Sequence, residues 1–106
     1  MIKFLIEASY TSDGAKGVLK AESGTSRKQM TDKMIAELGG KMEAFYYVTN
    51  CDAYVICELP DMASAAAIAL TIKATGLGSV STTVLLDPEE IDKATKLAVK
   101  YRGPGN

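Results

Sequence analysis

The chain has no histidine and no tryptophan among its 106 residues. Histidine is the commonest general base and metal ligand in proteins, so its absence excludes a Ser-His-Asp or Cys-His mechanism within one chain. Cysteine and acidic residues do not recur with the spacing of a metal site. We therefore expect no metal and no cofactor, and any catalysis would depend on carboxylates, tyrosines or thiols.

The chain also lacks a surplus of charge of either sign. Lysine and arginine number 12 and aspartate and glutamate 13, which gives a net charge of −1. A nucleic-acid surface needs a basic excess, and an anionic membrane attracts clustered basic residues. The first apolar run is broken by Lys3 and Glu7, unlike a signal peptide or a membrane span. The sequence predicts neither a nucleic-acid nor a membrane partner.

Cysteine is scarce, with only Cys51 and Cys57. If residues 53–58 form a strand, the two lie up to about 20 Å apart at roughly 3.3 Å per residue. A disulfide needs Cα atoms about 4.4–6.8 Å apart. We therefore expect free thiols, a reducing compartment and a cytoplasmic location, with Cys57 as a small core residue.

The composition that remains is that of one globular domain. It is 47% hydrophobic and 24% charged, near the average for such domains. The length fits one domain, predicted over residues 1–102 with a frayed tail at 103–106.

Alternation and helical spacing predict the order β-α-β-β-α-β with an extra C-terminal helix. Residues 11–14 have turn chemistry, and residues 15–24 are expected to be a loop, with one helical turn as an option. Capping signals begin helices at Ser26 and Pro88. The predicted fold class is α+β, a ferredoxin-like four-stranded antiparallel sheet covered on one face by helices. The predicted strands are 2–10, 41–49, 53–59 and 79–86, and the predicted helices are 26–38, 62–75 and one that begins at 88.

Both faces of the predicted strands carry large apolar groups, although a sheet with one wet face needs only one apolar face. Such an exposed patch marks an interaction surface, so we expect a homodimer or higher homo-oligomer. Two alternatives stay open: the C-terminal helix folds back over this face, or a different protein covers it. A dimer still leaves room for a ligand cavity between sheet and helices. The predicted interface residues are Leu5, Phe45, Tyr47, Tyr54, Ile56 and Leu85.

Several short runs in fixed order resemble the GYD domain family over nearly the whole chain. They are residues 38–41 with the strands that follow, the Asp52 turn, residues 58–61 with the alanine-rich helix, and the strand at 78–86. The resemblance implies a fold of the dimeric α+β barrel type and no particular activity. The family's Gly-Tyr-Asp signature stands here as Asn50-Cys51-Asp52, so only Asp52 matches and a role for the tyrosine is not carried over.

The candidate ligand-binding residues are Tyr46, Tyr47, Asp52 and Tyr54. Phenols that face a cleft orient polar ligands, and a carboxylate after a hairpin acts as an acid, a base or a ligand contact. The alternatives are that the tyrosines only pack and that Asp52 bonds turn amides.

Three further side chains have the same two interpretations. Lys16 and Arg27 are candidates for an anionic ligand, or else solvated cations. Cys51 is a candidate nucleophile or redox thiol, or else an incidental turn thiol. Two functions remain open. The first is a homo-oligomeric small-molecule-binding or assembly module, and the second is a cofactor-free enzyme such as a small monooxygenase or isomerase. A dry pocket that contains Asp52 or a tyrosine hydroxyl would favour the enzyme.

Overall fold

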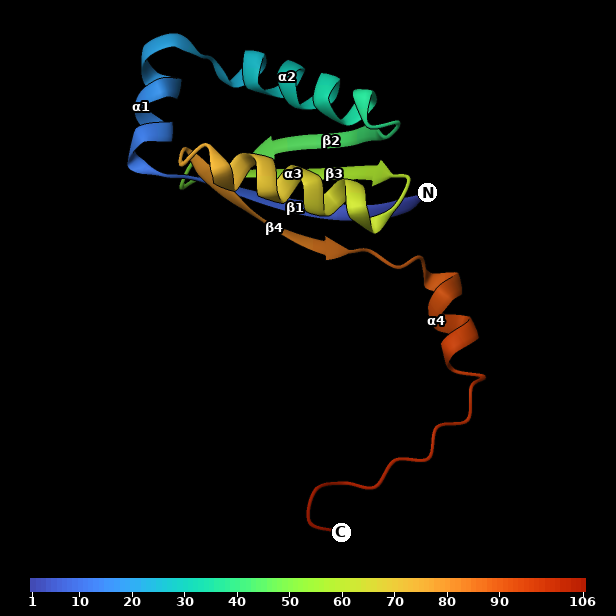
Figure 1. Cartoon of the computed structure of the whole chain (residues 1–106). Coiled ribbons are helices and arrows are strands. Elements are labelled where there is room, and N and C mark those ends of the chain that lie inside the picture. Colours follow the sequence, from blue (N-terminus) through green and yellow to red (C-terminus); the bar gives the residue numbers. More distant parts are fainter.

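The computed structural model describes all 106 residues and has the predicted α+β architecture. Four antiparallel strands form one sheet in the order β2-β3-β1-β4, which is the ferredoxin-like arrangement. Helices α2 and α3 lie along one face of this sheet, and α1 stands at one end (Figure 1). The elements are β1 (Ile2–Tyr10), α1 (Ser12–Ala21), α2 (Gly24–Glu37), β2 (Lys41–Tyr47), β3 (Ala53–Leu59), α3 (Met62–Ala74), β4 (Gly78–Val84) and α4 (Pro88–Ala94).

The core lies between the sheet and helices α2 and α3. Phe4, Cys57 and Leu59 from the strands pack with Ile35 from α2 and Ile68 from α3. Cys57 is fully buried, as predicted, and burial raises the pKa of its thiol to about 11. Both cysteines are free. No helix has the length and apolar character needed to cross a membrane.

The connection from β1 to β2 is more helical than predicted. Thr11 caps α1, since its Oγ1 accepts the Gly14 N–H at 3.1 Å, so residues 11–14 begin a helix. Ser23 caps α2, and Ser26 is its partner in a capping box rather than the cap itself. Glycines within α1 lower its helix propensity, which explains why the sequence pattern indicated a loop.

A β-bulge between Met42 and Ala44 corrects the predicted faces of β2. Beyond the bulge Phe45 pairs with Val55 and Tyr47 with Ala53, so both lie on the helix-covered face. Alternation had placed them on the opposite face. We call that opposite face the outer face; its residues are Lys3, Leu5, Glu7, Ser9, Lys41, Glu43, Ala44, Tyr46, Tyr54, Ile56, Glu58, Ser79, Ser81 and Thr83.

The chain leaves the folded part after β4. We call residues 86–106 the C-terminal arm; it includes α4 and projects away from the sheet (Figure 1). Every residue from Leu86 to Arg102 is exposed. The last helix ends at Ala94, and it does not fold back over the outer face. Leu85, half-buried, donates its N–H to the Lys3 carbonyl at 2.9 Å and is the last residue tied to the sheet.

Candidate functional site

A cavity of about 540 Å³ lies between the helix-covered face of the sheet and the three helices above it. Its floor includes Ala8, which pairs with Ala53 on one side and Val80 on the other. Toward the opposite end of the sheet, Phe4 and Leu59 fill the equivalent space. The cavity exists because a row of small side chains across three strands does not reach the helices.

The helices leave the same space open from above. Gly14, Gly17 and Ala21 of α1 line the cavity with little or no side chain. Met30 and Met34 of α2 also line it, and methionine adapts to ligands of different shape. The lining is therefore mostly apolar.

Polar groups converge at the end of the cavity nearest α1. Tyr10, Glu22 and Arg27 line this end. Arg27 Nη1 lies 4.0 Å from Glu22 Oε1, while Glu22 Oε2 accepts the Ser26 hydroxyl at 2.7 Å. The capping box of α2 thus positions the carboxylate of Glu22, which lies beside the guanidinium of Arg27.

Tyr47 belongs to a second, smaller cavity of about 350 Å³ beside the first. Tyr10 and Val18 line both and form the wall between them. Burial, together with a hydrogen bond to Tyr10 and the charge of that phenol, raises the pKa of Tyr47 to about 12. The positive charge of Arg27 lowers the pKa of Tyr47, but by less than these effects raise it. Tyr47 is therefore a neutral hydrogen-bonding group near neutral pH and not a base.

The other predicted site residues do not reach either cavity. Asp52 Oδ2 accepts the Ser9 hydroxyl at 3.0 Å, and the Asp52 N–H donates to Asn50 Oδ1 at 3.1 Å. The carboxylate is thus bonded to the Ser9 side chain of β1, and the backbone N–H of Asp52 is bonded within the turn. Tyr46 and Tyr54 pair with each other on the outer face. The structure brings Tyr47 together with Tyr10, not with Asp52.

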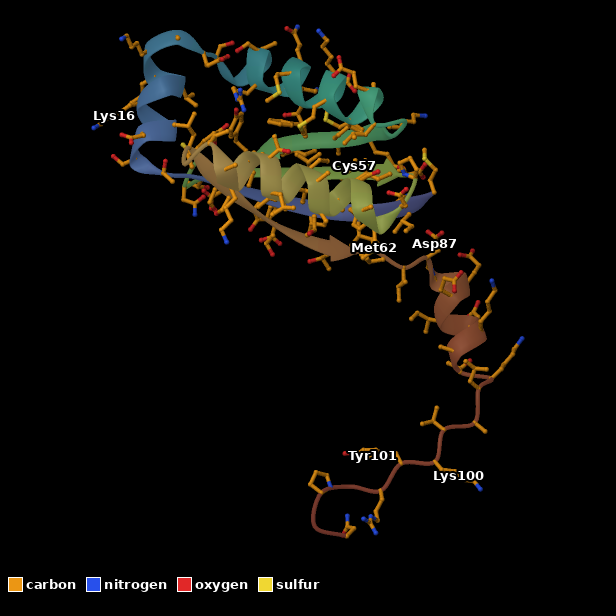
Figure 2. The ribbon with its side chains drawn as sticks, viewed as in Figure 1. Lys16, Cys57, Met62, Asp87, Lys100 and Tyr101 are labelled. Atoms are coloured by element: carbon orange, nitrogen blue, oxygen red, sulfur yellow. The ribbon has the colours of Figure 1, made fainter.

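Of the two cationic candidates, only one reaches a cavity. Lys16 points outward from α1 (Figure 2), whereas Arg27 reaches the cavity. Cys51 sits in the hairpin turn with a positive φ of 71° and lines the smaller cavity. Its thiol faces a carbonyl oxygen, that of Thr49 at 4.0 Å, and no cation.

Sequence reasoning missed Tyr10, Glu22 and the small floor residues. A signal for Tyr10 and Ala8 was present, because alternation in β1 places both on the same face as the core residues, with small Ala8 two positions before Tyr10. No three acidic or cysteine side chains come together in a way that would hold a metal ion.

The fold and the cavity define a class: a ferredoxin-like α+β protein with a ligand-sized space beneath its helices. The model of the GYD domain family matches residues 4–95, so the chain belongs to the GYD domain family. No curated protein and no solved structure matches it. The family predicted from the sequence is confirmed.

Proposed function

We propose that this GYD-domain protein is a homo-oligomeric module that binds a small molecule between its sheet and its helices. The observation that carries the proposal is the cavity of about 540 Å³ with its apolar walls and one polar end. Ligand cavities of proteins typically have about 300–1,000 Å³ and a few convergent polar groups.

The lining indicates the chemistry of the ligand. An apolar body fits between the Ala8-Ala53-Val80 floor and the methionines of α2. A hydroxyl or carboxylate on that body would meet Tyr10 and Arg27. The 4.0 Å separation of Arg27 from Glu22 is long for an ion pair, which leaves guanidinium N–H groups for a ligand.

The cofactor-free enzyme alternative has weaker support. Asp52, its best candidate, lies outside the cavity and is bonded to Ser9. The one carboxylate in the lining, that of Glu22, accepts the Ser26 hydroxyl. We therefore propose binding rather than catalysis.

The outer face supports the homo-oligomeric part of the proposal. Tyr46 is 72% exposed and Tyr54 37% exposed, and Leu5 and Ile56 lie between charged residues on the same face. The helices cover only the opposite face. A contiguous apolar patch of this kind is typical of a protein interface.

Binding of two fluorescent probes tests the ligand proposal. 1-Anilinonaphthalene-8-sulfonate supplies an aromatic body with an anion, and N-phenyl-1-naphthylamine supplies the body alone. Ala8→Leu fills the cavity floor and should weaken both probes at least about tenfold, because a side chain then occupies the ligand's volume. Ala66→Leu, on the exposed side of α3, is the matched control and should bind like the wild type.

Arg27→Gln should weaken the anionic probe more than the neutral one. Equal binding by wild type and Ala8→Leu would mean that the probes bind elsewhere, and the ligand proposal would be wrong.

A further inference from the structure

The C-terminal arm carries apolar side chains that its own chain does not bury. Leu97 is 71% exposed, Val99 80% and Tyr101 80%. Three large apolar side chains so close together on a projecting segment are unusual for a segment that stays in water.

The arm has the pattern of a half-buried strand. From 96 to 102 the chain alternates, with Leu97, Val99 and Tyr101 at odd positions and Lys96, Lys100 and Arg102 at even positions. The segment is not helical, and a period of two gives an extended chain one apolar and one basic side. Figure 2 shows Lys100 and Tyr101 far out on this arm. The pattern requires an apolar surface to pack against.

The shape of the molecule shows that the arm does not pack against an apolar surface of its own chain. The radius of gyration is 17.3 Å, whereas a compact chain of 100 residues has about 13 Å. The principal extents are 57 × 34 × 25 Å, and the arm accounts for the elongation (Figure 1).

The outer face of the sheet matches the arm in chemistry. It offers Leu5, Tyr54 and Ile56 as an apolar strip. Four carboxylates border the strip and only two lysines, of which Lys3 is already paired with Glu43 at 3.3 Å. The four acidic side chains of the arm all precede its alternating segment, and Lys93 is paired with one of them, Glu90, at 3.5 Å, so the segment from 96 to 102 supplies three cations and no acidic side chain. The carboxylates are those of Glu7, Glu43, Asp52 and Glu58, and the cations are Lys96, Lys100 and Arg102.

We propose that the C-terminal arm of one copy packs across the outer face of a second copy, and that the exchange is reciprocal. The proposal rests on the homo-oligomeric part of the proposed function and names the element that makes the contact. Seven extended residues span about 23 Å at 3.3 Å each, and four strands lie across about 14 Å. The segment is therefore long enough to cross the sheet.

Truncation tests whether the arm holds the assembly together. A chain that ends at Thr95 lacks the alternating segment, and a chain that ends at Arg102 lacks only the last four residues and is the control. Light scattering should give the mass of a dimer for the full chain, which is twice 11.3 kDa, and for the control, and the mass of a single chain for the shorter chain. The dissociation constant of the shorter chain should rise at least about tenfold. Its circular dichroism should stay that of a folded domain, because the deleted side chains are exposed in the structure.

Paramagnetic broadening tests where the arm lies. A spin label goes on Tyr101→Cys in a Cys51→Ser background, and buried Cys57 is protected from labelling. This chain is mixed with an isotope-labelled chain without the spin label, so that any broadening arises between copies. The amides of Leu5, Tyr54 and Ile56 should broaden, and those on the exposed side of α3 should not.

Each outcome has one meaning. A dimer of the shorter chain, or a dimer whose outer-face amides stay sharp, overturns arm exchange but leaves the homo-oligomer intact. A monomeric full chain overturns both, while the probe experiment still decides ligand binding separately.

Discussion

At the scale of single residues, two glycines of α1 have opposite surroundings although they lie three positions apart. A Cβ on Gly14 would be 1.9 Å from the carbonyl oxygen of Leu77, which is backbone and cannot move aside. The same oxygen accepts the Thr11 N–H at 3.0 Å, so it fixes the start of α1. A Cβ on Gly17 would meet nothing within 4 Å.

Alanine substitution at these two sites should therefore have opposite effects. Gly14→Ala should lower the free energy of unfolding by roughly 2–3 kcal/mol through overpacking. Gly17→Ala should raise it by roughly 0.5–1 kcal/mol, because alanine is the better helix former. Urea unfolding followed by circular dichroism measures both. Equal effects would contradict the close approach of α1 to Leu77.

Cys57 should make stability depend on pH. Its pKa rises from 9.0 to about 11 on burial, so the unfolded chain loses this proton first as the pH increases. Stability is then complete below pH 9 and falls as the pH rises toward 11. By pH 10 the loss should be about 1 kcal/mol.

Urea unfolding under reducing conditions between pH 7 and 10 measures this loss. Cys57→Ala is the comparison and should show a flatter profile, whatever its stability at pH 7. Parallel profiles of the two proteins would refute the assignment to this thiol.

At the scale of elements, the capping box of α2 links local structure to the cavity. Ser23 Oγ accepts the Ser26 N–H at 3.1 Å, and Ser26 Oγ accepts the Ser23 N–H at 3.0 Å. Ser26 also donates to Glu22, which lies beside Arg27. The cap thus holds both the helix start and the polar end of the cavity.

Substitution should separate these two roles. Ser23→Ala should cost about 1 kcal/mol of stability by loss of the cap. Ser26→Ala should leave the free energy of unfolding less affected but release Glu22, and it should change the affinity for the anionic probe. Urea unfolding and probe titration measure the pair. A larger stability loss for Ser26→Ala would indicate that the helix starts at Ser26 after all.

The elements show what sequence patterns can and cannot predict. The third strand was predicted at 53–59 and lies there, because β-branched and aromatic residues stand between two turns. Helix α1 was missed because Gly14 serves tertiary packing against Leu77, which a local pattern does not record. The bulge in β2 was missed because one inserted residue leaves no mark in composition.

The same limits apply to the candidate site. Tyr47 was predicted to lie on the outer face, but it lines the smaller cavity on the helix-covered face, since the bulge shifts the alternation of β2. Asp52 would line a cavity under the enzyme interpretation alone, and its bond to Ser9 on the outer side of the sheet depends on strand register. The cavity itself arises from three small residues on three strands, and only their pairing makes them neighbours.

At the scale of the whole molecule, the two faces of the sheet have separate tasks in our proposals. The helix-covered face forms the ligand cavity, and the outer face receives the arm of a second copy. Ala8 belongs to the first face and Ile56 to the second, and they lie on neighbouring strands. Substitutions on one face should therefore leave the other function nearly intact, because the sheet separates the two sites.

Salt should weaken the assembly if the arm's cations meet the carboxylates of the outer face. Raising the salt from 50 to 500 mM shortens the Debye length from about 14 Å to about 4 Å, which screens exposed charges. We expect the dissociation constant of the dimer to rise about three- to tenfold, as sedimentation equilibrium would measure. A variant with Lys96→Gln, Lys100→Gln and Arg102→Gln should start weaker and respond little to salt. A wild-type dimer that tightens with salt would indicate that apolar contact alone holds the two copies, and the charge match between arm and outer face would lose its role.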